Sequence, residues 1–151
     1  MHINNSKTIT MSNEEYFQNL RKLNYEQRLI FDGIMLHKRL NPTQKISLFI
    51  TGGAGTGNFF LLLLIIQGLL RYYNHKQNEN TKNTKVLLMA YTRKAAFNIG
   101  GTTIHSTLHL PLITNNQTSL SQEKLDELSL LYKDVQLIVI DEISLVGSNI
   151  F

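Results

Sequence analysis

The spacing of apolar residues predicts helices over much of the chain. Apolar positions recur three and four residues apart, as on one face of a helix, and the pairs Ser12 with Glu15 and Asn24 with Gln27 mark helix starts. The expected helices cover residues 12–21, 25–40, 57–73, 92–97, 103–108 and 121–132, and helical structure begins again at residue 143.

Short apolar runs between these helices predict strands. The runs cover residues 45–51, 85–90 and 135–140. Apolar runs of this kind are typical of strands that a parallel sheet buries on both faces. Strands that alternate with helices predict an α/β fold with a parallel sheet, in which ligands bind beyond the carboxyl ends of the strands.

Three polar segments are expected to lie outside the α/β layer, and one apolar run is expected to lie in its core. We expect residues 1–11 to be a mobile lead-in, and residues 75–84 and 114–119 to be exposed connections. The apolar run of residues 59–66 is interrupted well short of the roughly 20 residues that span a membrane. It therefore predicts a buried core helix and no membrane partner.

The composition is that of a globular protein from a reducing compartment. A length of 151 residues suits one domain with a core, and 42% hydrophobic with 17% charged residues argues against disorder. The absence of cysteine excludes disulfides and thiolate metal sites. No signal-peptide pattern opens the chain, so we expect an intracellular protein. The net charge of +4 allows a basic groove for nucleic acid without indicating one.

A glycine-rich loop between residues 51 and 58 carries the first candidate chemistry. Four glycines in six positions exceed what an ordinary turn needs, and they let backbone N–H groups surround a phosphate at a helix N-terminus. In the motif G-x-x-x-x-G-K-[ST], a lysine and a Mg²⁺-binding hydroxyl residue follow, whereas this chain has Asn58 and Phe59. A disabled site and an ordinary turn therefore stay open as alternatives. The candidate nucleotide-binding residues are Gly52, Gly53, Ala54, Gly55, Thr56, Gly57, Asn58 and Phe59.

An acid pair, Asp141 and Glu142, follows the apolar run of residues 135–140. Two adjacent acids can also be a solvated strand end. Because the loop and the pair both follow predicted strands, we expect them to share one crevice at the carboxyl edge of the sheet. In that arrangement Asp141 holds Mg²⁺ through water and Glu142 polarises the attacking water.

Four segments resemble, in family order, the N-terminal motor half of the Pif-type ATP-dependent DNA helicases of superfamily one. They are LNYEQ at residues 23–27, FITGGAGTG at 49–57, AAFNIGGTTIHS at 95–106 and IDEISLVG at 140–147. The resemblance implies a RecA-like P-loop NTPase three-layer fold over residues 23–151, incomplete at the C-terminus, after a lead-in and short helix over residues 1–22. The second motor domain of the family is expected to be absent from this chain.

The resemblance also implies cofactors, partners and residue roles. ATP and Mg²⁺ are the expected cofactors and single-stranded DNA the expected partner of a 5′-to-3′ helicase. Gln27 is expected to read adenine, Asp141 to bind the metal and Glu142 to be catalytic; the capping box alone is an alternative explanation of Gln27. The residues expected to approach DNA are Thr92, Arg93, Lys94, Thr103 and His105. A solvated charge at Lys94 and a helix-start histidine at His105 are the alternatives there.

Three departures from the family pattern change the expected activity. Asn58 replaces lysine, Phe59 replaces threonine or serine, and Arg93 stands where glycine is usual. Translocation also needs two domains that move against each other. We therefore expect a chain that is inactive alone, or a non-catalytic module that binds single-stranded DNA or a protein partner, including the missing motor domain. The resemblance implies a setting in genome maintenance or in a rolling-circle mobile element, and the nucleus or mitochondrion if the source is eukaryotic.

Overall fold

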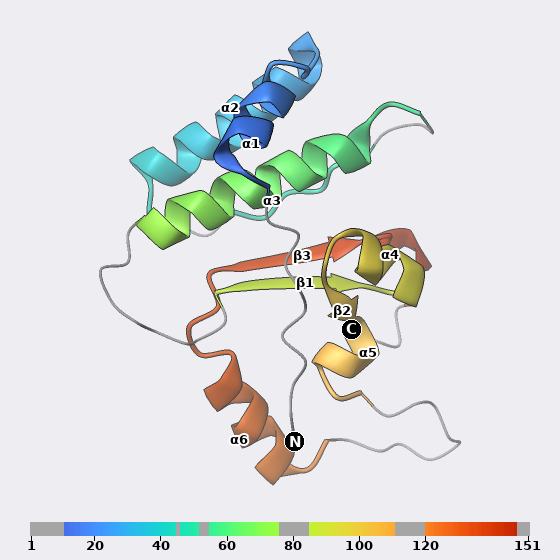
Figure 1. The fold of residues 1–151 in the computed structure, drawn as a ribbon. Helices are drawn as coiled ribbons and strands as arrows, with labels where there is room; N and C mark the ends of the chain where they lie inside the picture. The colour runs from blue at the N-terminus through green and yellow to red at the C-terminus, as the bar shows by residue number, and fades with distance from the viewer. Residues whose placement is uncertain (1–10, 45, 52–54, 76–84, 111–119, 148–151) are drawn as a thin grey trace. The chain divides into compact units, whose positions relative to one another are not determined.

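The chain forms two compact units. The computed structural model describes residues 11–44, 46–51, 55–75, 85–110 and 120–147, without the side chains of residues 74 and 75. One unit, Thr10–Asn78, is called the helical unit here; the other, Glu79–Phe151 with Met1–Ile9, is called the sheet unit. Figure 1 shows the helices and strands of each.

The described residues of the helical unit form three helices, and all three were predicted from the sequence. They are α1 (Asn13–Leu20), α2 (Tyr25–Leu40) and α3 (Asn58–His75). The hydroxyl of Ser12 accepts a hydrogen bond from the Glu15 N–H at 3.1 Å, which caps α1. Asn24 and Gln27 form the reciprocal capping box that begins α2. Both α1 and α2 pack against α3.

Helix α3 is the core element of this unit, as its apolar sequence predicted. Leu61, Leu64 and Ile66 are almost fully buried, and Phe31 and Ile34 of α2 are buried as well. Among the described residues, no helix combines the length and apolar character that crossing a membrane requires. The expectation of a core helix in this stretch is therefore confirmed.

Arg71 of α3 fastens the start of α1. Its Nη2 donates to the carbonyl oxygen of Met11 at 2.7 Å, and its guanidinium lies 4.2 Å from the ring centroid of Tyr16. The Met11 N–H donates in turn to Gln67 Oε1 at 3.2 Å. Met11, the last residue of the predicted lead-in, is therefore bonded to α3, because an arginine fork can bind several carbonyls at once. Residues 1–10 lie outside the described residues, and a mobile lead-in stays a prediction.

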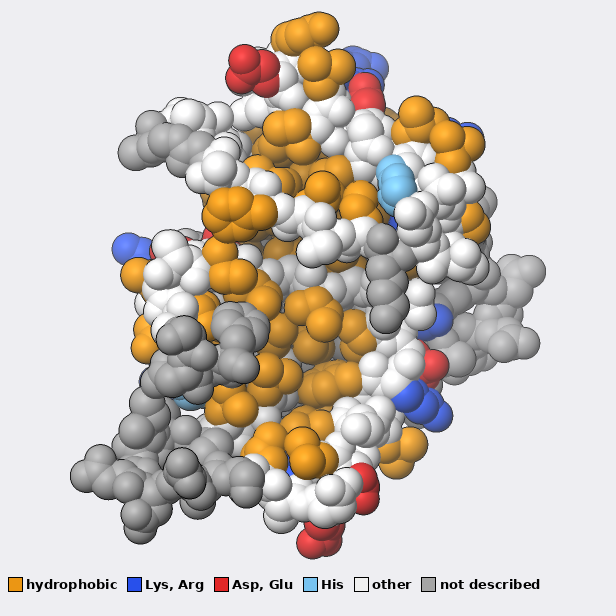
Figure 2. All heavy atoms as spheres, turned by 180° about the vertical axis from the view of Figure 1, so that it is seen from behind, with side chains coloured by type: hydrophobic (Ala, Val, Ile, Leu, Met, Phe, Trp, Pro, Cys, Tyr) orange, Lys and Arg blue, Asp and Glu red, His pale blue; other side chains and the backbone are white. Residues whose placement is uncertain are grey.

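The strand predicted over residues 45–51 does not form in the described part, residues 46–51. A strand needs ladder hydrogen bonds to a neighbour, and among the described strands none pairs with this segment. Leu48 and Phe49 are 56% and 74% exposed, and Figure 2 shows that hydrophobic side chains reach the surface in many places. Together with α2 the segment lines a groove of about 430 Å³.

The sheet unit contains the parallel sheet that the sequence predicted. Its strands are β1 (Val86–Ala90), β2 (Thr102–Thr103) and β3 (Leu137–Asp141), in the order β2-β1-β3, with both pairings parallel. The runs that predicted β1 and β3 were therefore read correctly. Strand β2 was not predicted, because two threonines are too short a pattern to recognise.

Short helices follow each strand in the sheet unit (Figure 1). Helix α4 (Arg93–Asn98) begins at the N-cap Thr92, α5 (Ile104–Thr107) at Thr103 and α6 (Gln122–Leu131) at Ser121. These three helices were predicted. A 3₁₀ turn, η1 (Ile143–Leu145), follows β3 where helical structure was expected to begin. The predicted connections at residues 114–119 and 76–84 lie outside the described residues.

The core of the sheet unit lies against one face of β1. Leu87, Met89 and Ile104 form a buried cluster against which Tyr132 and Ile140 pack. Leu88 and Ala90, on the other face of β1, are buried too, so β1 is covered on both faces as predicted. The same prediction is wrong for β3, where Ile138 is 57% exposed. The reason is that β3 is an edge strand of the described sheet.

The close approach of β2 to β1 requires glycine at position 101. A Cβ atom there would lie 2.2 Å from the carbonyl oxygen of Leu88. We expect Gly101→Ala to lower the free energy of unfolding by about 1–3 kcal/mol, because backbone atoms must move apart. Urea denaturation followed by circular dichroism measures this change.

The matched control is Gly33→Ala in α2, where nothing lies within 4 Å of the added Cβ. This variant should instead be more stable, by about 0.5–1 kcal/mol, since alanine is the better helix former. Equal stability of Gly101→Ala and the wild type would contradict the role assigned to the β1–β2 contact.

Candidate functional site

The carboxyl ends of the three strands bring most of the predicted site residues of the sheet unit together. Ala90 at the end of β1 is paired with Asp141 of β3 on one side and with Thr103 of β2 on the other. Whatever follows Ala90 therefore lies beside the acid pair and beside the start of α5. The residues gathered at this edge are Tyr91, Thr92, Lys94, Thr103, His105, Asp141 and Glu142.

Thr92 and Glu142 make the direct contact at this edge. The Thr92 hydroxyl donates a hydrogen bond to Glu142 Oε2 at 3.1 Å. Thr92 Oγ1 also accepts a hydrogen bond from the Ala95 N–H at 3.2 Å and thereby caps α4. One side chain thus joins the start of α4, a segment expected to approach DNA, to the residue expected to be catalytic.

The backbone of Glu142 has an uncommon conformation. Its φ is 53° and its ψ is 40°, the left-handed region that residues other than glycine seldom adopt. The Glu142 N–H donates to Asp141 Oδ1 at 2.9 Å, a local bond that favours this turn. Conformations of this kind cost free energy and occur often at functional sites.

The acid pair fits Mg²⁺ only in combination with phosphate oxygens. Within the described ranges no cluster of three or more potential metal-ligating side chains occurs. Magnesium in phosphate sites is commonly bound by one or two carboxylates together with substrate phosphates and water. Asp141 and Glu142 supply carboxylates of that kind, and Asp141 is the partly buried one of the two.

Two aromatic rings lie at the same edge. The rings of Tyr91 and His105 have centroids 5.9 Å apart and meet edge to face. Thr103 caps α5 through its hydroxyl, which accepts from the Ser106 N–H at 3.3 Å. Tyr91 was missed by the sequence prediction; the signal that could have found it is an aromatic residue directly after a buried strand and next to basic residues.

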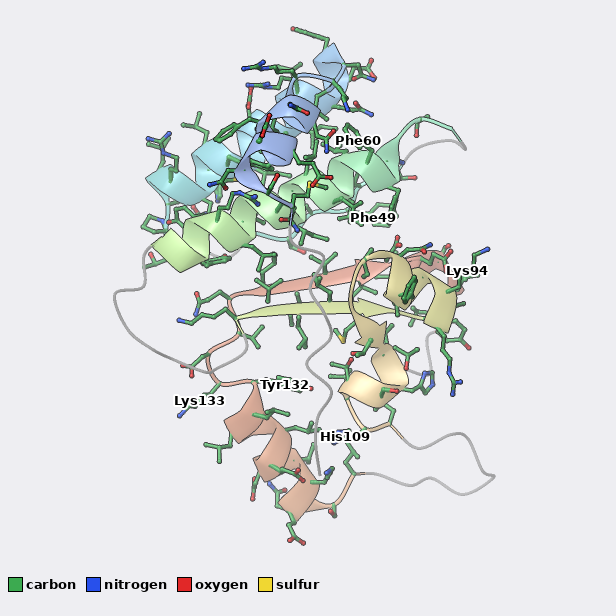
Figure 3. All side chains as sticks on the ribbon, in the orientation of Figure 1. Phe49, Phe60, Lys94, His109, Tyr132 and Lys133 are labelled. Carbon is green, nitrogen blue, oxygen red and sulfur yellow. The ribbon has the colours of Figure 1, made fainter. Side chains whose placement is uncertain are left out.

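Arg93 and Lys94 are both exposed in the first turn of α4. Figure 3 shows Lys94 at the end of the sheet where β1 and β3 finish, and Lys133 at the opposite end, where β3 begins. Lys133 is also exposed and follows α6. The two lysines therefore differ mainly in which edge of the sheet they occupy.

The glycine-rich loop belongs to the helical unit. Gly52, Gly53 and Ala54 lie outside the described residues, whereas Gly55 and Gly57 have φ values of 81° and 76°. Positive φ values at both positions explain why glycine is needed there. The crevice predicted between this loop and the acid pair would join residues of two units, and it stays a prediction.

Gln27 connects the loop to the start of α2. Its Nε2 donates to the carbonyl oxygen of Thr56 at 3.0 Å, while its Oε1 accepts from the Asn24 N–H at 3.2 Å. The capping role weighed from the sequence is therefore confirmed, and the loop contact comes in addition. An amide group can make further hydrogen bonds beyond these two, so adenine recognition stays a compatible prediction.

Asn58 and Phe59 begin α3 directly after the loop. Asn58 is neutral, and the ring of Phe59 is 43% exposed and carries no oxygen. A triphosphate with Mg²⁺ calls for a cation and a hydroxyl at these two positions. The loop side of the predicted nucleotide site therefore does not fit that ligand, although the acid side does.

Comparison with known proteins adds family information to this geometry. A family model described as PIF1-like helicase matches residues 22–151. The chain is 33% identical over 114 residues to "ATP-dependent DNA helicase Pif1" of Campylobacter jejuni, a match that covers 70% of this chain and 23% of the relative. It is 39% identical over 85 residues to "ATP-dependent DNA helicase PIF7" of Trypanosoma brucei brucei, which covers 56% of this chain and 7% of the relative.

A yeast protein shows the same relationship. The chain is 29% identical over 109 residues to "ATP-dependent DNA helicase RRM3" of Saccharomyces cerevisiae, covering 71% of this chain and 14% of the relative. The chain thus spans less than a quarter of the length of these three relatives. No solved structure matches it.

The contact between the loop and Gln27 leads to a stability prediction. A Cβ at Gly57 would lie 2.8 Å from Gln27 Nε2, whereas a Cβ at Gly55 would have nothing within 4 Å. Both substitutions by alanine should cost about 1–2 kcal/mol for the left-handed backbone. Only Gly57→Ala should also displace the Gln27 side chain.

A double-mutant cycle separates the two effects. Gly57→Ala combined with Gln27→Ala should show a coupling of at least about 0.5 kcal/mol in urea denaturation, because both remove the same contact. Gly55→Ala combined with Gln27→Ala is the control and should be additive. Additivity in both pairs would mean that Gln27 does not hold the loop.

Proposed function

The chain belongs to the PIF1-like helicase family, and on that premise we propose that it is part of the motor of a 5′-to-3′ ATP-dependent DNA helicase. The observation that carries the proposal is the edge of the sheet unit, where the segment expected to approach DNA is bonded to the acid pair through Thr92 and Glu142. DNA maintenance, including repair, recombination and telomere maintenance, is the proposed setting, in the nucleus or mitochondrion if the source is eukaryotic.

Single-stranded DNA is the proposed partner of this edge. Arg93 and Lys94 offer exposed positive charge for phosphates, and the rings of Tyr91 and His105 offer faces and edges on which bases can stack. Thr103 lies beside them at the end of β2. Cations that track the backbone, together with aromatic rings, are the usual means of binding single strands without sequence preference.

ATP handling is proposed to be impaired in this chain. By resemblance to the family, the residues that would hold ATP and Mg²⁺ are Gln27, residues 52–57, Asp141 and Glu142. ATP would supply the phosphoryl group that water attacks. Asn58 leaves the phosphates without the usual lysine charge. The loss of one preorganised electrostatic contact costs about 10²–10³ in rate, and Phe59 removes the metal-binding hydroxyl as well. We therefore propose that this chain does not hydrolyse ATP by itself.

A non-catalytic module that binds single-stranded DNA is the second candidate. It is favoured by the contrast between the loop, which has no lysine at position 58, and the edge of the sheet unit, which carries Arg93, Lys94 and the Thr92 contact. Under this reading DNA binds without nucleotide. A protein partner, such as a second motor domain, is compatible with either candidate.

The first functional prediction concerns DNA affinity. Lys94→Ala should weaken binding of a fluorescein-labelled oligo(dT) strand, measured by anisotropy, and should reduce the slope of log K against log salt by about 0.7, the value for one phosphate contact on a single strand. Lys133→Ala, at the opposite end of β3, is the matched control and should leave affinity and slope unchanged. Equal effects of the two substitutions would contradict the proposal that DNA binds at this edge of the sheet.

The second functional prediction concerns the nucleotide. Asn58→Lys combined with Phe59→Thr should create Mg²⁺-dependent binding of a fluorescent ATP analogue, because the pair restores the cation and the metal-binding hydroxyl. Adding Glu142→Gln to this variant should keep the binding and prevent any gain in hydrolysis. The wild-type chain is the baseline, and failure of the double variant to bind nucleotide would argue against an ATP scaffold in this chain.

A further inference from the structure

We propose that Thr92 is a positioning residue through which a bound DNA strand changes the location of the Glu142 carboxylate. The inference rests on the proposed function, because it takes Glu142 as the catalytic carboxylate and residues 92–94 as a DNA contact. It goes further by joining these two into one device within the sheet unit. No role of Thr92 toward Glu142 follows from its position in the sequence, 50 residues earlier.

The argument begins with the single proton of a hydroxyl group. A threonine hydroxyl has one hydrogen to donate and two lone pairs to accept with. At Thr92 one lone pair accepts from the Ala95 N–H, and the hydrogen is directed at Glu142 Oε2. A phosphate or sugar oxygen of a strand bound at residues 92–94 would compete with Glu142 for that same hydrogen.

Competition for the Thr92 hydrogen should change the position of the Glu142 side chain. The left-handed backbone of Glu142 is held by the Thr92 bond on the side chain, by the Asp141 Oδ1 bond on the N–H and by the Leu145 N–H, which donates to the Glu142 carbonyl oxygen at 3.0 Å. Of these bonds, the Thr92 bond is the one that holds the carboxylate itself, and its loss leaves the side chain without that restraint. A strand that takes the Thr92 hydrogen should therefore allow the Glu142 carboxylate to move.

The register of the sheet makes the link short. Ala90 and Asp141 are paired, so Thr92 and Glu142 extend from adjacent strand ends. The cap that Thr92 gives to α4 also ties the hydroxyl to the helix that bears Arg93 and Lys94. Any displacement of α4 by a bound strand acts directly on the donor to Glu142.

Substitutions at position 92 can separate the cap from the bond to Glu142. Thr92→Asn keeps an oxygen that caps α4 and adds an N–H donor for Glu142, whereas Thr92→Asp keeps the cap and offers no donor. Both residues are good N-caps, so α4 should form in each variant. The amide signals of Ala95 and Phe97 in ¹⁵N-labelled protein report whether it does.

The experiment follows amide signals during titration with an oligo(dT) strand of about 12 nucleotides. In the wild type and in Thr92→Asn, the Glu142 signal should move with the same midpoint as the Lys94 signal. In Thr92→Asp, the Glu142 signal should be displaced before DNA is added and should respond little at saturation. Glu142→Gln competes less well than glutamate for the hydrogen of Thr92, so it should tighten DNA binding. The gain should be about two- to fivefold larger than that of the charge control Glu123→Gln on α6. It should appear only in variants that have a hydrogen-bond donor at position 92.

Each remaining outcome decides against the inference. If saturating DNA moves the Lys94 signal and leaves Glu142 unchanged, the coupling is wrong and the proposed DNA binding stands. If Thr92→Asp has a Glu142 signal identical to that of the wild type, Thr92 does not position the acid. If no signal responds to DNA, the proposed DNA binding fails and the coupling fails with it.

Discussion

The parallel pairing of β1 with β3 is the constraint on which the candidate site depends. The register places Ala90 opposite Asp141, and Thr92 and Glu142, which follow these strand ends, are joined by a hydrogen bond. A slip of one residue would turn every side chain of β3 to the other face. A slip that put Asp141 in the place of Ile140 would bring a carboxylate against the buried cluster of Leu87, Met89 and Ile104, and burying an unpaired charge is costly. The geometry of the acid pair is thus a consequence of apolar packing beneath it.

The helices and their starts could be predicted because the signals are local. A cap joins residues three apart, so Ser12, Asn24, Thr92 and Ser121 could be recognised as N-caps without knowledge of the fold. The same holds for the adjacent acids at the end of β3, whose position after an apolar run indicates the carboxyl edge of a sheet. These features depend on residues that are close together in the sequence, so they can be recognised without a structure.

The features that sequence reasoning missed depend on residues far apart in the chain. The bond from Gln27 to Thr56 joins positions 29 residues apart. The apolar run of residues 46–51 shows a preference for burial, but pairing needs a partner strand that the run itself does not encode. Strand β2 is the converse case, because it forms without an apolar run. Its two threonines pair with β1 where Gly101 lets the backbone approach Leu88. Alternation and composition report burial, whereas register and edges are properties of the assembled sheet.

The two halves of the predicted nucleotide site take their conformations from different contacts. Asp141 and Glu142 take their conformation from a turn, a strand register and one threonine hydroxyl, all within the sheet unit. Their arrangement therefore does not depend on which residue stands at position 58. The loop, in turn, owes its described shape to two glycines with positive φ and to Gln27, and none of these is altered by the residues at positions 58 and 59. Because each half is built from its own contacts, neither needs a lysine at position 58 or a hydroxyl residue at position 59 to keep its shape. The charge and the metal ligand of the intact motif depend on the side chains at these two positions alone, so they can differ without a change in either half.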